Sequence, residues 1–260
     1  MLRAFHPFAV PADADKIVLS GEESFHLAKV LRGTEGEAVS AFDGRGNVWE
    51  GKIVGGTAKA LEISIAARRT VAAPQCRISL AQALPKGSLM DDIVRQATEI
   101  GAARIFPLLS SRCEVRLDDA RAEKKSERWN AIATESCKQC GNALLPEIFP
   151  VMKFRDFCEK FAPATMRNTL GIVASLEAGT RNCGDIAADA DPTTSEILWL
   201  VGPEGDFSPE EYSLARAAGF VPARLGQNIL RSVTAAIYTL AVADQMRQNL
   251  QQRNAIISKK

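Results

Sequence analysis

The stretch from Glu196 to Leu250 constrains the fold most, because it contains two successive units of strand, glycine-containing loop and helix. The first unit begins with the apolar run ILWLV, which is too short for a helix and suits a strand buried on both faces. A Gly-Pro-Glu-Gly turn follows, and Ser208, Pro209 and Glu211 then predict a helix start with a capping box. This half of the chain is therefore predicted to form a parallel α/β sheet.

The second unit runs from a short strand at 221–225 through Gly226 to a helix with apolar residues at three- and four-residue spacing. In parallel sheets, ligands bind beyond the carboxyl ends of the strands, where loops expose backbone groups. Neither loop has the phosphate-loop ending or the dinucleotide fingerprint, so both of those functions are disfavoured. Together the loops offer free backbone, apolar side chains and one cation, which suits a flat aromatic ligand.

The N-terminal part of the chain has a different, mostly β pattern. Ser20 and Glu23 predict a capping box that starts a helix reaching Leu31. Strands are expected at 38–42, 48–54 and 61–66. Near residue 72 this pattern ends and helices begin to alternate with apolar strands. We therefore expect two domains, at residues 1–71 and 72–260.

In the second domain, strands are expected at 77–84, 103–109 and 170–175, and helices at 88–100, 117–140 and 154–161. Ser88, with Asp91 three residues later, is expected to cap the first of these helices. The polar stretch from Thr180 to Ser195 is expected to be a mobile loop.

Composition narrows the class of protein. Hydrophobic residues make up 46% of the chain and charged residues 24%, which fits an ordinary soluble protein, and the net charge of +1 does not by itself indicate nucleic-acid binding. No apolar run approaches the roughly 20 residues that cross a bilayer, and the start of the chain is not a secretory signal. We expect a cytoplasmic protein without a membrane partner.

Six cysteines are scattered without the spacing of a disulfide framework. Cys137 and Cys140 form a Cys-x-x-Cys pair, but a structural zinc site normally takes four ligands, and His6 and His26 are far away in the sequence. Helix packing is the favoured interpretation of this pair, and no metal is expected.

Four blocks of the sequence resemble segments of the RsmE family of ribosomal RNA methyltransferases, in the same order along the chain. They are FHLAKVLR, KGSLMDDIVRQATEIGAARIFPLLSSRCEV, ESCKQCGNALLPEI, and LVGPEGDFSPEE followed by LGQNILRSVTAAIYTLAV. The resemblance implies a small PUA-like β-barrel domain, followed by an α/β SPOUT domain with a parallel sheet, helices on both faces and a C-terminal trefoil knot. It also implies methylation of uracil N3 in 16S ribosomal RNA of the small subunit, with S-adenosylmethionine as cofactor, by a homodimer.

The same resemblance assigns roles to individual residues. Cofactor binding is implied for residues of three strand-end loops: Ser175, Leu176, Val201, Gly202, Pro203, Glu204, Gly205, Leu225, Gly226, Ile229 and Leu230. Arg231 matches the family's catalytic arginine. RNA contacts are implied for Arg32, Arg112, Arg231 and Thr234.

The chemistry of uracil N3 requires the imide to lose a proton while negative charge develops on the base, and a fixed cation can stabilise that charge. Arg231 is the expected cation, and Ser232 and Thr234 are expected to cap the last helix or to contact substrate. The general base stays open among Glu204, Asp206, Glu135 and solvent.

Some positions depart from the family pattern. Gln227 and Asn228 replace the usual Pro-Arg, and Val233 stands where an acidic residue is expected. Two alternatives therefore remain open: a SPOUT methyltransferase with another RNA target or a ribose acceptor, and a nonenzymatic RNA-binding or ribosome-assembly factor with a decayed site.

Overall fold

The computed structural model describes residues 1–114, 118–161 and 163–257, and the chain divides into two compact units. Unit 1 consists of Met1–Ala73 and Thr134–Leu145, and unit 2 consists of Pro74–Ala133 and Pro146–Lys260. The sequence predicted a single boundary near residue 72. It did not predict that residues 134–145 group with the N-terminal part.

Unit 1 is built on a six-stranded sheet. Its strands are β1 (Leu2–Phe5), β2 (Lys16–Val18), β3 (Ala38–Phe42), β4 (Asn47–Thr57), β5 (Ala60–Ser64) and β6 (Ala67–Thr70). The order is β1-β3-β4-β5-β2, with β6 also paired to β4, and every pair except β1–β3 is antiparallel. The three strands expected from the sequence correspond to β3, β4 and β5. Alternating apolar residues of these strands, such as Val39 and Ile63, are fully buried in the core.

The helix of unit 1 is shorter than expected. An α-helix, α1 (Gly21–Phe25), continues as one π-helical segment, η1 (His26–Val30). Arg32 follows the end of this segment in a left-handed conformation with φ of 56°. The Ser20 hydroxyl accepts from the Glu23 amide, at 3.3 Å, as the capping box predicts.

The second half of that capping box is replaced by longer-range contacts. The Glu23 carboxylate accepts from the Phe5 amide, at 3.1 Å, and pairs with the Lys138 ammonium, at 2.8 Å. Because both carboxylate oxygens have these partners, Glu23 does not reach back to Ser20. The prediction from local sequence was therefore half right.

Unit 2 contains an eight-stranded, wholly parallel sheet. Its strands are β7 (Arg77–Ala83), β8 (Arg104–Leu109), β9 (Glu147–Ile148), β10 (Met152–Lys153), β11 (Thr169–Ala174), β12 (Arg181–Asn182), β13 (Glu196–Val201) and β14 (Val221–Arg224). The order is β10-β8-β7-β13-β11-β14-β12, with β9 also paired to β8. The buried run ILWLV is the central strand β13, all of whose residues are buried.

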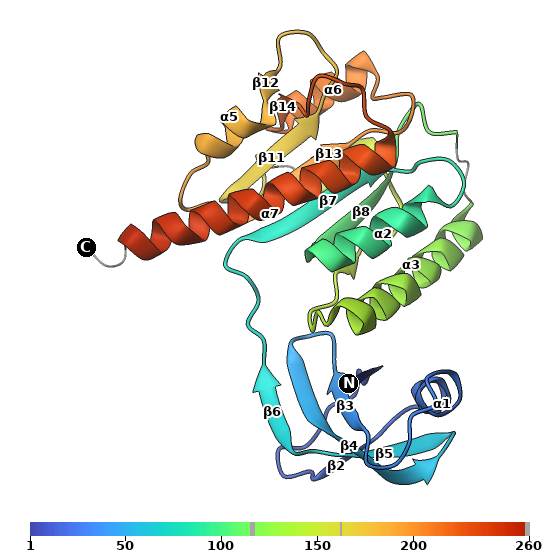
Figure 1. Cartoon of the computed structure of the whole chain (residues 1–260). Helices are drawn as coiled ribbons and strands as arrows, with labels where there is room; N and C mark the ends of the chain where they lie inside the picture. The colour runs from blue at the N-terminus through green and yellow to red at the C-terminus, as the bar shows by residue number, and fades with distance from the viewer. Residues whose placement is uncertain (115–117, 162, 258–260) are drawn as a thin grey trace. The chain divides into compact units, whose positions relative to one another are not determined.

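Helices cover both faces of this sheet, as the α/β prediction requires. They are α2 (Leu89–Ile100), α4 (Phe154–Lys160), α5 (Cys183–Ala188), α6 (Pro209–Ala217) and α7 (Ser232–Ile257). A further helix, α3 (Asp119–Cys140), is shared between the units, since its residues from Thr134 onward group with unit 1. Figure 1 shows α7 running across one face along β7 and β13, with α2 beside it. In the parts of the chain that the structure describes, no helix is long and apolar enough to span a membrane.

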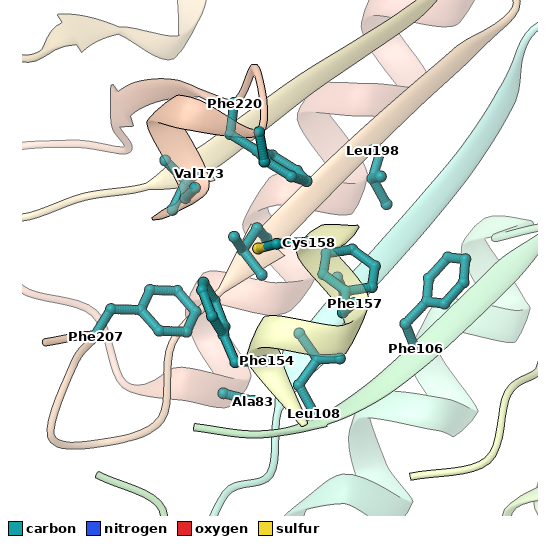
Figure 2. Close-up of a cluster of buried hydrophobic side chains, with 14 of the residues drawn as sticks. Ala83, Phe106, Leu108, Phe154, Phe157, Cys158, Val173, Leu198, Phe207 and Phe220 are labelled. Atoms are coloured by element: carbon teal, nitrogen blue, oxygen red, sulfur yellow. The ribbon is translucent and has the colours of Figure 1, made fainter. Parts of the chain in front are cut away.

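The opposite face is packed by an aromatic cluster. Phe154 and Phe157 of α4 meet Phe106 of β8, Phe207 and Phe220, as Figure 2 shows. Each ring is at most 3% exposed, so the cluster contributes a large share of the apolar burial that holds α4 and α6 on the sheet. The rigid sheet in turn fixes the positions of the strand ends.

Two local predictions in unit 2 need correction, whereas a third, the long helix, agrees with α3 (Asp119–Cys140). Ser88 makes no side-chain cap to α2, because the Asp91 amide donates to the Ser88 backbone carbonyl, at 2.9 Å. The Asp91 carboxylate does not reach back to Ser88 either, since it accepts from Trp129 Nε1, at 3.2 Å, and pairs with Arg128. The expected loop at 180–195 contains β12 and α5. The helix expected over 117–140 begins at Asp119, and Leu117 lies outside the described residues.

Candidate functional site

The loop after β13 is fixed by the helix start that follows it. The Ser208 hydroxyl accepts from the Glu211 amide, at 3.2 Å, and the Glu211 carboxylate accepts from the Ser208 amide, at 3.0 Å, which completes the predicted capping box. Gly202 opens the loop, where a Cβ would lie only 3.3 Å from Asp206 Oδ1. Glycine therefore allows the loop to fold back closely on itself.

The loops after β11, β13 and β14 meet at the carboxyl edge of the sheet, because these strands are neighbours and parallel. A pocket opens between them and the first turn of α7. It is lined by Ala174, Ser175, Leu176, Val201, Gly202, Pro203, Glu204, Asp206, Arg224, Leu225, Gly226, Asn228, Ile229, Leu230, Ser232 and Ala235.

The structure brings all the expected cofactor residues to this pocket except Gly205. Gly205 is exposed, and its carbonyl accepts from Arg112 Nη1, at 2.8 Å. Of the two positions that depart from the family pattern in this loop, Asn228 lines the pocket and Gln227 does not.

The lining of the pocket fits an adenosyl ligand that carries positive charge. Leu176 is 57% exposed and Ile229 is 79% exposed, so a flat apolar ring would cover side chains that otherwise face water. A Cβ on Gly226 would meet nothing within 4 Å, which leaves room for a ligand there. The ionisable lining residues are Glu204, Asp206 and Arg224, and the two carboxylates suit a cationic ligand.

Asp206 is held by a buried phenol. The Tyr212 hydroxyl donates to Asp206 Oδ1, at 2.7 Å, and Asp206 has a left-handed backbone with φ of 59°. Burial, together with this hydrogen bond, raises the pKa of Tyr212 above its usual range, so the phenol stays a donor. Asp206 therefore acts as a fixed acceptor in the wall of the pocket.

Glu204 is exposed and is oriented by the neighbouring loop after β7. Its Oε1 accepts from the Lys86 backbone amide, at 3.2 Å. The Lys86 ammonium pairs with Glu114, at 2.6 Å, and this contact raises the pKa of Lys86. Glu114 thus pairs with Lys86 and leaves Arg112 to contact the Gly205 carbonyl.

The start of α7 places Arg231 next to the pocket. Leu230 and Ser232, on either side of it, both line the pocket. The Arg231 side chain is exposed and has no hydrogen bond or ion pair with any described residue. Ser232 is 6% exposed and its hydroxyl donates to the Gly202 carbonyl, at 2.8 Å, so it joins the helix to the loop rather than capping the helix. Thr234 is exposed in the first turn.

The other residues expected to contact RNA divide between the two units. Arg112 belongs to unit 2 and is exposed where the loop after β8 contacts Gly205. Arg32 is exposed in unit 1. Glu135, one candidate general base, also groups with unit 1, where it pairs with Lys138, at 2.5 Å.

Sequence reasoning missed Gln82, a fully buried side chain near the end of β7. Its amide nitrogen donates to Ser232 Oγ, at 3.0 Å. The signal was present as a large polar residue inside the predicted buried strand RISLAQAL. A buried amide needs partners, so it indicates a specific interaction.

The Cys-x-x-Cys pair lies in unit 1. Cys137 is buried in an apolar cluster with Phe42, Val48 and Ala143, and burial raises the pKa of its thiol to about 12. Cys140 is exposed. Among the described residues, no group of three or more His, Cys, Asp and Glu side chains is arranged to hold a metal ion.

Comparison with known families and proteins gives concordant results. Residues 72–244 match the RNA methyltransferase domain family, and residues 19–66 match the RNA methyltransferase PUA domain family. The chain is 33% identical to ribosomal RNA small subunit methyltransferase E of Synechocystis sp., over 86% of this chain and 71% of the relative. It is 29% identical to the protein of the same name from Mycobacterium bovis, over 91% and 88% of the two chains.

Solved structures agree with these matches. Ribosomal RNA small subunit methyltransferase E from Neisseria gonorrhoeae, bound to S-adenosylmethionine, has a TM-score of 0.83 at 26% identity and covers 95% of this chain and 98% of its own. A methyltransferase from Legionella pneumophila in complex with the same cofactor has a TM-score of 0.82 at 30% identity, over 93% and 96% of the chains. The predicted fold class is confirmed.

Proposed function

This chain belongs to the family of ribosomal RNA small subunit methyltransferase E, and we propose that it methylates N3 of one uridine in 16S ribosomal RNA. It is an RNA methyltransferase that uses S-adenosylmethionine. The observation that carries the proposal is the pocket formed by the three strand-end loops beside Arg231. Its apolar lining and two carboxylates suit the adenosyl group and the positive charge of this cofactor.

The bound cofactor supplies an electrophilic methyl group to the acceptor nitrogen. We assign its binding to the pocket residues, with Leu176 and Ile229 covering the apolar ring and backbone groups of Gly202 and Gly226 lining its edges. Burial of two exposed apolar side chains stabilises the complex by about 1–3 kcal/mol.

Arg231 is assigned to stabilise the negative charge that develops on the uracil. Its guanidinium has no partner among the described side chains and follows the last pocket residues of the loop, so it is available to the substrate. Once bound RNA excludes water from the site, a cation held against the developing charge contributes about 3–4 kcal/mol to such a transition state.

We assign Glu204 as the general base that accepts the imide proton of the uracil. Asp206 already accepts a hydrogen bond from Tyr212. The exposed Glu204 carboxylate accepts from the Lys86 backbone amide through Oε1, and its Oε2 has no partner among the described residues. Solvent is the alternative acceptor of this proton.

Several exposed residues are assigned to RNA binding. Arg112 and Thr234 lie next to pocket-lining loops and face water, and Arg32 provides a further cation in unit 1. Phosphate contacts by such side chains position an RNA without reading its sequence. The substrate would be the small ribosomal subunit or its RNA.

A homodimer in the cytoplasm is the proposed working form. Tyr238 is 42% exposed on α7, and Ala241 is exposed one turn further on, which gives this helix a surface that a second copy can cover. Six free cysteines fit a reducing compartment.

The test uses small ribosomal subunits that lack the modification, incubated with the protein and S-adenosylmethionine and analysed by nucleoside mass spectrometry. We expect 3-methyluridine from the wild type, at least about 100-fold less from Arg231→Ala, and a wild-type yield from Arg95→Ala, an exposed arginine of α2. A ribose-methylated nucleoside would identify another acceptor. Cofactor binding without any product would contradict the proposal and favour the decayed-site alternative.

A further inference from the structure

Gln82 is a large polar side chain in the interior of unit 2, with an exposed fraction of 0%. It is paired in register with Val201, the last residue of β13 before the pocket loop. Its neighbours Ala81 and Ala83 point to the aromatic cluster, so the Gln82 side chain points to the other face, which α7 covers. Gln82 therefore lies beneath the junction of the loop and the helix.

The Gln82 amide nitrogen contacts three segments at once. It donates to the carbonyl of Ala83, at 2.8 Å, and to Ser232 Oγ, at 3.0 Å, with the Gly202 and Val201 carbonyls at 3.3 and 3.5 Å. Ser232 Oγ in turn donates to the Gly202 carbonyl, at 2.8 Å. One amide thus joins the end of β7, the loop after β13 and the first residue of α7.

The orientation of this amide is determined by its partners. Carbonyl oxygens only accept hydrogen bonds, so the NH₂ group must face them. The other atom of the amide, Oε1, is buried and has no hydrogen-bond partner among the described atoms. An unpaired buried acceptor costs about 1–3 kcal/mol. An apolar residue at this position would avoid that cost, so the donor contacts must provide something that packing alone does not.

We propose that Gln82 is a positioning residue of the methyltransferase site, which sets the Gly202 peptide and the start of α7 relative to each other. Gly202 and Ser232 both line the pocket, and Arg231 directly precedes Ser232. Without the amide donor, the loop and the helix start keep the Ser232–Gly202 hydrogen bond but lose their common anchor on β7. The pocket then loosens, and the backbone that carries Arg231 is held less firmly. The kinetic part of this inference rests on the proposed function, whereas the part on cofactor affinity does not depend on the RNA or the base.

The test replaces Gln82 by methionine, which keeps the length of the side chain and removes the donor. We expect the Kd for S-adenosylmethionine, measured by titration calorimetry, to rise about tenfold, and kcat to fall by a similar factor while KM for the RNA stays unchanged. Thr239→Val is the matched control, because Thr239 is a fully buried polar residue of α7 whose hydroxyl donates within its own helix. It should lower the unfolding midpoint and leave the Kd of the folded protein unchanged.

A double-mutant cycle with Ser232→Ala tests the route of the effect. If Gln82 acts through Ser232 and the Gly202 carbonyl, the double variant binds cofactor no more weakly than Gln82→Met alone. Additive losses, or a Gln82→Met protein that binds cofactor within twofold of wild type, would overturn the inference. If Gln82→Met does not fold, Gln82→Asn, which is one methylene shorter and cannot span the same three segments, is measured by the same criteria.

Discussion

Glu196 and Glu204 lie at opposite ends of the central strand β13, and their surroundings differ completely. Glu196 is 1% exposed at the amino end, where it accepts from Arg104 Nε, at 3.0 Å, pairs with Arg77, at 3.3 Å, and also accepts from Ser79. Glu204, in the loop beyond the carboxyl end, is exposed, and among the described residues its one hydrogen-bond donor is the Lys86 backbone amide. One carboxylate is therefore saturated by the fold, and the other remains available.

The difference shows how the same sheet separates stability from function. At the amino end, two arginines and a serine hydroxyl saturate the buried Glu196 carboxylate, so this acid is not available to a ligand. At the carboxyl end, loops present backbone groups and two exposed apolar side chains, and beside them stands Arg231, whose side chain is exposed and pairs with no described residue. Burial of a charge, taken alone, does not distinguish a functional site from a structural ion pair. A charged group beside a pocket that still has hydrogen-bonding atoms open to a ligand does indicate a functional site.

The contrast between the two ends of β13 would fail most clearly if a substitution of Glu196 changed cofactor binding. Glu196→Ala leaves the largely buried Arg104 without its partner, so we expect the free energy of unfolding to fall by about 3–5 kcal/mol. Urea denaturation measures this loss. The Kd for S-adenosylmethionine, measured where the variant is folded, should match wild type, and a weakened Kd with unchanged stability would contradict the assignment of this end to structure.

Gly226 provides the converse test at the carboxyl end. A Cβ there meets nothing within 4 Å, so we expect Gly226→Leu to fold normally and its side chain to occupy the pocket. We expect the Kd for S-adenosylmethionine to rise about 100-fold, roughly 3 kcal/mol, with an unchanged unfolding midpoint. Gly184 of α5 also has open space around it and is not part of the pocket, so Gly184→Leu is the matched control. Wild-type affinity in Gly226→Leu would place the cofactor elsewhere.

Glu211 sharpens the comparison, because it is a saturated carboxylate at the functional end. It is 7% exposed and accepts from the Ser208 amide and from the amide and hydroxyl of Ser111, at 2.7–3.0 Å. Glu211→Ala should lower the free energy of unfolding by about 2 kcal/mol, as measured by thermal unfolding. A loss of cofactor affinity larger than this loss of stability would show that saturation does not predict a structural role.

The smallest effect is expected for an exposed pair. Arg95 and Asp92 on α2 are 2.6 Å apart with side chains about half exposed. Water and salt screen such a pair, so Arg95→Gln should change the free energy of unfolding by less than about 0.5 kcal/mol, by urea denaturation in low and high salt. A change above 1 kcal/mol would mean that surface charges matter here as much as buried ones.

Local sequence predicted features whose partners are close in the chain. The Ser208–Glu211 capping box and the strand β13 followed directly from adjacent residues. At Ser88 the equivalent prediction was wrong, because the Asp91 amide bonds to the Ser88 carbonyl and the Asp91 carboxylate bonds to Trp129, a partner that a local pattern does not contain. The same limit explains why the short β12 and α5 were missed within a polar stretch.

The same limit applies to the candidate site, where some features could be predicted from the sequence and others could not. The pocket loops could be predicted because parallel strands bring their carboxyl ends together, and family resemblance supplied the residue roles. The role of Gln82 could not be predicted, because its partner Ser232 lies 150 residues away and the contact depends on how α7 crosses the sheet. Buried polar residues within strands are the positions where sequence patterns give least information about partners.

The measurement that tests the account most directly is methyl NMR of the protein as S-adenosylmethionine is added. We expect the methyl signals of Leu176, Leu225 and Ile229, at the carboxyl edge, to shift on binding. Ile78 and Ile197 are paired in register beside Arg77 and Glu196 at the amino edge, and their signals should stay in place. Shifts at Ile78 and Ile197 with none at the three pocket residues would contradict the assignment of the cofactor site.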